Sequence, residues 1–204
     1  MLTSVAPACA RAETALRDEF QSLTVAKEEL PPLTDWGVED FSETVHSLGI
    51  HYLALIGRRG GWIAVPEYPV RLTLPSGQLA DGPIFVKPDV VWWNRESRQA
   101  ELIAEFERYE PGLTKRQILQ EKVRNLLLAH RALGPAPRSL VLVLWTVSGM
   151  PIQGRDDLTA LIRSGFNQPG GVRICGLEPE SRFHIFTAVF ASSGGRLRLR
   201  EVLA

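Results

Sequence analysis

An uninterrupted apolar run over residues 139–145 constrains the fold of this chain most, because turn residues bound it on both sides. A strand with one face in water alternates apolar and polar residues, whereas a continuous run belongs to a strand covered on both faces. Apolar side chains recur at helical spacing just before it, over 114–133, and Gly134 and Pro135 form a common helix ending. We therefore expect a central sheet flanked by helices.

The part of the chain before this helix predicts two helices followed by strands. Alanine and leucine spacing favours a helix over 8–23, and Thr34 or Asp35 is expected to cap a second helix reaching about residue 56, which Gly49 could divide. The strand signals that follow predict an antiparallel meander. Its expected strands cover 62–65, 67–74, 88–93 and 101–107, with turns at 75–77 and 94–98.

The part after the buried run predicts a further helix, capped by Asp156 or Asp157 and ending near residue 164, and two or three strands from residue 172. A long helix between a meander and a buried strand implies a crossover connection in a mixed sheet. We predict one α/β domain of 204 residues. It would comprise an N-terminal helical segment (1–34), a core (35–146) and a C-terminal helix with strands (147–204).

Composition limits the function only weakly. The 23 basic and 23 acidic residues cancel, so net charge does not favour a nucleic-acid partner, although a local basic groove remains compatible with a neutral protein. Cys9 and Cys175 belong to no CxxC pair, which argues against a disulfide framework or a structural zinc site and fits a reducing cytoplasm. We expect no signal peptide and no membrane span, because the apolar runs are short.

Three acidic residues form the candidate functional site. Asp89 opens one predicted strand, and the next carries Glu105 and Glu107, which strand alternation places on the same face. Neighbouring carboxylates repel one another, and Mg²⁺ or Mn²⁺ is the natural counter-charge because hard cations prefer oxygen ligands. The competing interpretation is a solvated ion-pair face in which Glu107 pairs with Arg108 or Lys115.

Pro88-Asp89, followed after a gap by Glu105-x-Glu107, resembles the signature of the PD-(D/E)xK nuclease superfamily. The order of elements is also similar over residues 38–146. The resemblance implies a restriction-endonuclease-like core and hydrolysis of DNA phosphodiester bonds with Mg²⁺ or Mn²⁺. Asp89, Glu105 and Glu107 would be the metal ligands, DNA the partner and a homodimer a possible assembly.

The sequence departs from that signature at Glu107, where family members usually carry a lysine. Lys122 or Lys115 of the following helix could supply the missing cation, with Arg124 as a substitute that does not titrate. The alternative for Lys122 is a solvated helix face. Glu67 and Glu43 are further candidate acids, with an edge-strand charge and an exposed helix residue as their respective alternatives.

Three hypotheses about function follow. The first is a metal-dependent endonuclease or exonuclease in which Asp89, Glu105, Glu107 and Lys122 form the catalytic site. The second is a catalytically inactive binding or assembly protein with the same fold, which the neutral charge and Glu107 favour slightly. The third is an unrelated α/β protein whose acidic residues are structural.

Overall fold

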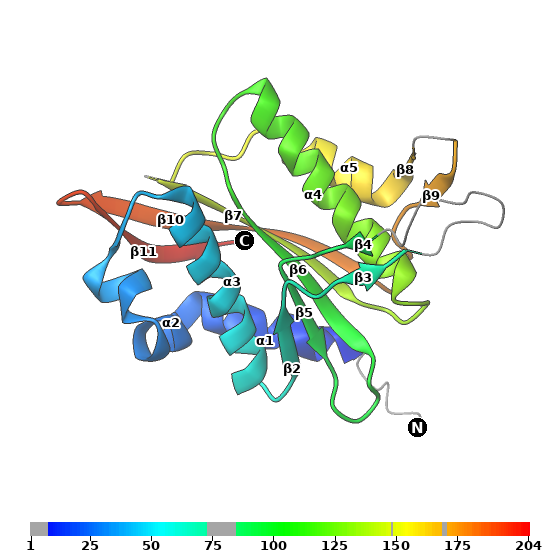
Figure 1. Cartoon of the computed structure of the whole chain (residues 1–204), viewed down its shortest axis with the longest axis horizontal. Coiled ribbons are helices and arrows are strands. Elements are labelled where there is room, and N and C mark those ends of the chain that lie inside the picture. Colours follow the sequence, from blue (N-terminus) through cyan, green and yellow to red (C-terminus); the bar gives the residue numbers. More distant parts are fainter. Residues whose placement is uncertain (1–7, 73–84, 148, 169–170) are drawn as a thin grey trace.

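The computed structural model describes residues 8–72, 85–147, 149–168 and 171–204 as helices on both faces of a mixed sheet (Figure 1). The helices are α1 (Ala8–Ser22), α2 (Thr24–Glu29), α3 (Ser42–Arg59), α4 (Leu113–Ala132) and α5 (Arg155–Ser164), with a π-helical turn over Pro32–Trp36. The strands are β1 (Val38–Glu39), β2 (Ile63–Pro66), β3 (Val70–Arg71), β4 (Phe85–Val86), β5 (Val90–Trp93), β6 (Ala100–Arg108), β7 (Ser139–Val147), β8 (Gly165–Asn167), β9 (Arg173–Cys175), β10 (Arg182–Ser193) and β11 (Arg196–Leu203).

The main sheet has seven strands in the order β1-β11-β10-β7-β6-β5-β2. β6, β7 and β10 run parallel, and the other neighbouring strands pair antiparallel. Parallel neighbours need a crossover connection, and α4 supplies it between β6 and β7, as α5 does between β7 and β10. The predicted α/β class, mixed sheet and crossover are therefore confirmed.

β7 lies at the centre of the sheet and is buried on both faces, as its apolar run predicted. Alternate side chains enter two separate cores because successive residues of a strand point to opposite faces. One set packs with α1, α2 and α3, and consists of Val141, Val143 and Trp145. The other packs with α4 and α5, and consists of Leu140, Leu142 and Leu144.

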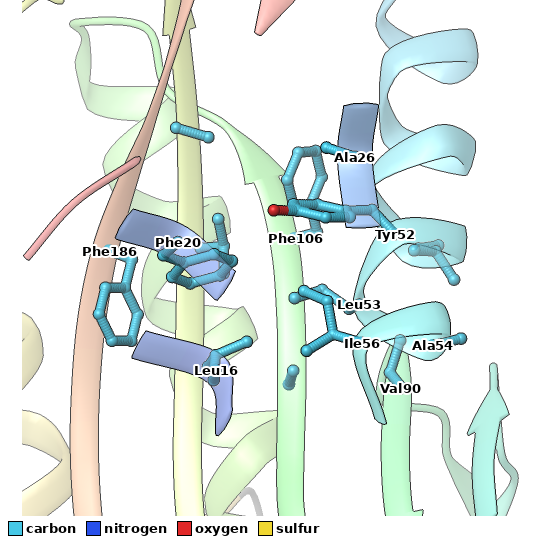
Figure 2. Packing of buried hydrophobic residues seen from close by; sticks show 14 of the residues in the cluster. Leu16, Phe20, Ala26, Tyr52, Leu53, Ala54, Ile56, Val90, Phe106 and Phe186 are labelled. Atoms are coloured by element: carbon cyan, nitrogen blue, oxygen red, sulfur yellow. The ribbon is translucent and has the colours of Figure 1, made fainter. Parts of the chain in front are cut away.

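The core on the α1–α3 side is rich in aromatic contacts (Figure 2). The Phe20 ring of α1 meets the Phe186 ring of β10 edge-on, with 4.9 Å between centroids. The buried Glu19 carboxylate accepts hydrogen bonds from the Tyr52 hydroxyl (2.7 Å) and from the backbone N–H groups of Val25 and Ala26. These bonds satisfy the carboxylate and attach the α1–α2 junction to α3.

Two predictions about the second helix are wrong. α3 begins at Ser42, because residues 32–39 instead form the π-helical turn and β1, which pairs with β11. Gly49 does not divide the helix. A Cβ atom there would lie 2.2 Å from the Phe106 ring, so this glycine lets α3 approach β6 closely.

The predicted strand over 67–74 is wrong in extent and position. Within its described part, residues 67–72, the structure has a strand only over Val70–Arg71, which pairs with β4 in a separate two-stranded ribbon. Glu67 has a φ of 49°, which turns the chain away after β2, and β5 takes the position beside β2. The end of that expected strand and the expected turn at 75–77 lie outside the described residues.

The C-terminal predictions hold apart from one detail. The residue at the N-cap of α5 is Gly154, and Asp156 and Asp157 lie in the first turn instead. Their negative charges still favour this end of the helix dipole. Beyond residue 172 the structure has β9, β10 and β11, within the expected number of strands. Among the described helices, none is long and apolar enough to cross a membrane.

Candidate functional site

The candidate site lies where β5 begins beside β6. Val90 pairs with Ala104, so the following residues of β6 have no partner from β5. Asp89, just before β5, fills this place: its Oδ2 accepts a hydrogen bond from the Phe106 N–H at 2.8 Å. The bond fixes the buried Asp89 carboxylate at the edge of the strand pair.

Lys122 of α4 brings the three predicted acids together. Its Nζ lies 2.7 Å from Glu105 Oε2, and 3.7 Å from both Asp89 Oδ1 and Glu107 Oε2. The Lys122 side chain is only 21% exposed, so the alternative of a solvated helix face is wrong. α4 packs over β6 in Figure 1, which explains how a residue 17 positions after Glu105 reaches it.

Glu107 has a second cation. Lys115 lies seven residues before Lys122, two helical turns away on the same face of α4, and its Nζ donates to Glu107 Oε1 at 2.6 Å. Both side chains are 16% exposed. Glu107 therefore lies in the acidic cluster, as the first interpretation predicts. It also forms an ion pair with Lys115, as the competing interpretation predicts.

Glu105 is the acid of the site whose charged form is least favoured by its surroundings. Burial raises the pKa of Glu105 well above its ordinary value, and the negative charge of Asp89 raises it further, while Lys122 lowers it. Its side chain is fully buried, and its Oε1 has no hydrogen-bond partner. A buried carboxylate oxygen without a partner is costly, so this atom needs a proton or a cation.

Burial and the neighbouring acids have opposite effects on the pKa of Lys122. Burial alone would lower the pKa of Lys122, but the charges of Glu105, Asp89 and Glu107 raise it above its ordinary value. The ammonium group is therefore charged at neutral pH. It provides a fixed positive charge beside Asp89, Glu105 and Glu107.

The other candidates lie outside this cluster or at its edge. Glu67 pairs with Lys87 at 2.8 Å, which lowers the pKa of Glu67, and Glu43 is exposed on the first turn of α3. Arg124 pairs with Glu121 on the outside of α4. Glu43 fits its alternative of an exposed helix residue, and neither Glu67 nor Arg124 contacts the three acids through a salt bridge among the described residues.

Sequence reasoning missed His46, whose Nε2 lies 3.6 Å from Asp89 Oδ1. The histidine is on α3, and no motif connects it with the acids. Its place follows only from the packing of α3 against β6, where the His46 ring also lies beside Phe106. No signal in the sequence could have identified it.

The fit of a divalent cation depends on two carboxylates. The described residues contain no group of three or more His, Cys, Asp or Glu side chains arranged to hold a metal. Mg²⁺, however, commonly keeps several waters and uses one or two carboxylates together with substrate phosphate. Asp89 and Glu105 contact the same ammonium group, and the free Oε1 of Glu105 offers an oxygen ligand. These two residues fit Mg²⁺ or Mn²⁺.

Comparison with known proteins gives no family for the chain, since no family model, curated protein or solved structure matches it. The function is therefore inferred from the geometry of the site and from the resemblance in its residues.

Proposed function

We propose that this protein is a metal-dependent nuclease that hydrolyses DNA phosphodiester bonds, with a restriction-endonuclease-like core. The observation that carries the proposal is the position of Lys122, which contacts Asp89, Glu105 and Glu107 together from the helix after them. A carboxylate cluster with fixed cations beside it suits a phosphate group, whose negative oxygens need positive charge on more than one side.

Each residue has a defined role in this proposal. Asp89 and Glu105 hold the divalent ion, which supplies a polarised water and neutralises phosphate charge when it is bound. Lys122 donates to a phosphate oxygen and stabilises the negative charge that develops during hydrolysis. Lys115 holds Glu107 in place, so Glu107 orients the ammonium of Lys122.

A second candidate function is a nuclease-fold binding or assembly protein without catalytic activity. One observation favours it: Lys115 and Lys122 offset most of the charge of the three acids without any metal. The two candidates differ in metal affinity. The enzyme must bind a divalent ion, whereas the binding protein already has a nearly neutral cluster.

Asp89→Asn separates these functions. We expect wild-type protein to bind Mn²⁺ in calorimetry and to cleave plasmid or oligonucleotide DNA, and Asp89→Asn to lose both while its thermal unfolding remains cooperative. Glu121→Gln, an exposed change on α4, is the matched control and should behave as wild type. Mn²⁺ binding without cleavage of any DNA substrate would favour the binding protein, and absence of Mn²⁺ binding would rule out the metal site.

A further inference from the structure

A pocket of about 250 Å³ lies at the edge of β10, between α1 and α5. α1 covers one face of the sheet and α5 the other (Figure 1), so each helix contributes to the pocket from its own side. Arg17 comes from α1 and Arg155 from α5, and the first part of β10 forms the wall between them. Among the described residues that line the pocket, none has an acidic side chain.

The edge of β10 that lines the pocket has no neighbouring strand. β11 pairs with β10 only from Thr187 onward, so among the described strands residues 182–186 have a partner on the β7 side alone. The Arg182 N–H donates to the carbonyl just before β7, and alternation along the strand then directs the N–H groups of Phe183 and Ile185 to the open side. The pocket therefore has two backbone donors that no described strand takes.

Arg17 is held at the pocket by three groups. Its Nε donates to Glu13 Oε1 at 2.9 Å, its Nη2 donates to His184 Nδ1 at 3.0 Å, and its Cζ lies 5.2 Å from the centroid of the Phe186 ring. Neither hydrogen bond uses Nη1. Glu13 also pairs with Arg182 at 3.1 Å, so one carboxylate serves two arginines and the cluster keeps a surplus of positive charge.

Arg155 forms no salt bridge with any described residue, including Ala204, which also lines the pocket. Its Nη2 donates to the Ile185 carbonyl at 2.6 Å, which directs the guanidinium along the open edge and occupies that carbonyl. An added peptide strand would need this carbonyl as an acceptor, whereas an anion needs only donors. The open edge therefore suits an anion better than a peptide.

We propose that this pocket binds a phosphate group, carried by a small phosphate monoester or by a nucleic-acid backbone. A carboxylate has two oxygens in one plane, which a single arginine can satisfy, whereas the oxygens of a phosphate point in several directions. The two arginines approach from opposite faces of the sheet, and the two backbone N–H groups lie on the strand between them. The inference does not depend on the proposed nuclease activity, because no residue of the carboxylate cluster lines this pocket.

Arg155→Gln tests the proposal, and Arg163→Gln is the matched control because Arg163 is exposed on α5 and does not line the pocket. Arg155→Lys keeps the charge but loses the paired hydrogen bonds of a guanidinium, so it gives a second measurement if Arg155→Gln does not fold. The probes are phenyl phosphate, benzoate, which carries a carboxylate on the same ring, and a single-stranded oligonucleotide. Binding is measured by calorimetry in EDTA, which prevents divalent ions from adding phosphate binding at the carboxylate cluster.

We expect phenyl phosphate to bind wild-type protein and Arg163→Gln alike, and to bind Arg155→Gln at least about tenfold more weakly, with Arg155→Lys between them. Benzoate should bind wild-type protein more weakly than phenyl phosphate does. An oligonucleotide that binds more tightly than phenyl phosphate and loses affinity in Arg155→Gln would identify the nucleic-acid backbone as the source of the phosphate. The opposite order of affinities would identify a small monoester.

Three results would overturn the inference. The first is that wild-type protein binds neither phenyl phosphate nor the oligonucleotide. The second is equal affinity of Arg155→Gln and Arg163→Gln for the phosphate probes, which would place any binding elsewhere on the protein. The third is tighter binding of benzoate than of phenyl phosphate, which would make the pocket a carboxylate site.

Discussion

Two charged clusters, one at the middle of α4 and one just beyond its C-terminal end, differ in what their cations contact. At the middle of α4, Lys122 contacts the carboxylates of Asp89, Glu105 and Glu107. At the C-terminal end, Arg138 is 1% exposed, and its Nη atoms donate to the backbone carbonyls of His130, Leu133 and Gly134. Lys122 contacts side-chain carboxylates, whereas Arg138 donates mainly to backbone carbonyls and also contacts the His130 ring.

The Arg138 cluster has a structural explanation. The last carbonyls of a helix have no intrahelical donor, and a cation at that end also favours the helix dipole. Burial lowers the pKa of Arg138 to about 10, which leaves it charged at neutral pH. His130 extends the cluster by bonding to Glu178 through Nε2 at 2.8 Å, while burial lowers the pKa of His130.

The Lys122 cluster has no such backbone role. Its acids outnumber the cations Lys115 and Lys122, and Oε1 of Glu105 remains without a partner. Arg138 Nε also lacks a partner, so an unsatisfied atom alone does not separate the clusters. The difference lies in the surplus of buried acid, which folding does not require and a cation would relieve.

Removal of the structural cation should have the largest effect. We expect Arg138→Met to lower the free energy of unfolding by about 3–5 kcal/mol, because the end of α4 and His130 lose their buried donor. DNA cleavage per folded molecule should not change. Urea unfolding measures this, with the exposed Arg163→Met as control at less than about 0.5 kcal/mol. If Arg138→Met lowers the free energy of unfolding by less than about 1 kcal/mol, Arg138 does not have the structural role that distinguishes it from Lys122.

Removal of the functional cation should affect catalysis instead. We expect Lys122→Met to reduce cleavage about 10²-fold, which corresponds to about 2.7 kcal/mol, because the phosphate loses its fixed positive charge. Single-turnover cleavage measures it, and the exposed Lys27→Met is the control. Unchanged cleavage in Lys122→Met would assign the role to Lys115 or to no lysine.

The protonation of Glu105 should make stability depend on pH. Because its pKa is raised in the folded protein, the folded state holds a proton that the unfolded state releases above its ordinary pKa. The contribution of Glu105 to stability is therefore fully present below its ordinary pKa and is lost as pH rises toward the raised pKa, by up to about 1.4 kcal/mol for each pH unit. In Glu105→Gln, the thermal unfolding midpoint should depend less on pH between pH 5 and 8 than in the wild type. A slope equal to that of the control Glu121→Gln would contradict the assignment.

The smallest effect should come from Glu107, which Lys115 already neutralises. We expect Glu107→Gln to weaken Mn²⁺ binding by less than about tenfold, or under about 1.4 kcal/mol, since the ion depends on Asp89 and Glu105. Calorimetric titration of wild type and variant measures this. Loss of binding as complete as in Asp89→Asn would make Glu107 a direct ligand, while identical affinity would place it outside the metal site.

The structure also shows why some sequence predictions failed. The strand over 67–74 has the right residue types, but strand propensity does not specify the partner of a strand, and the turn at Glu67 removes that segment from the main sheet. The start of α3 was misplaced because Thr34 lies in a π-helical turn and Phe41, which has no side-chain cap, precedes the helix. Local signals of helix capping did not decide that boundary.

The sequence by itself determined the central buried strand, the crossover helix and the alternation of Glu105 with Glu107, because each depends on the period of one element. Only the tertiary structure decided which cations meet these acids. Lys122 is one of several polar residues on α4, and the packing of that helix over β6 selects it. His46 reaches Asp89 for the same reason, from a helix on the other face of the sheet. Contacts between elements depend on how whole faces pack, and the local order of residues does not encode them separately.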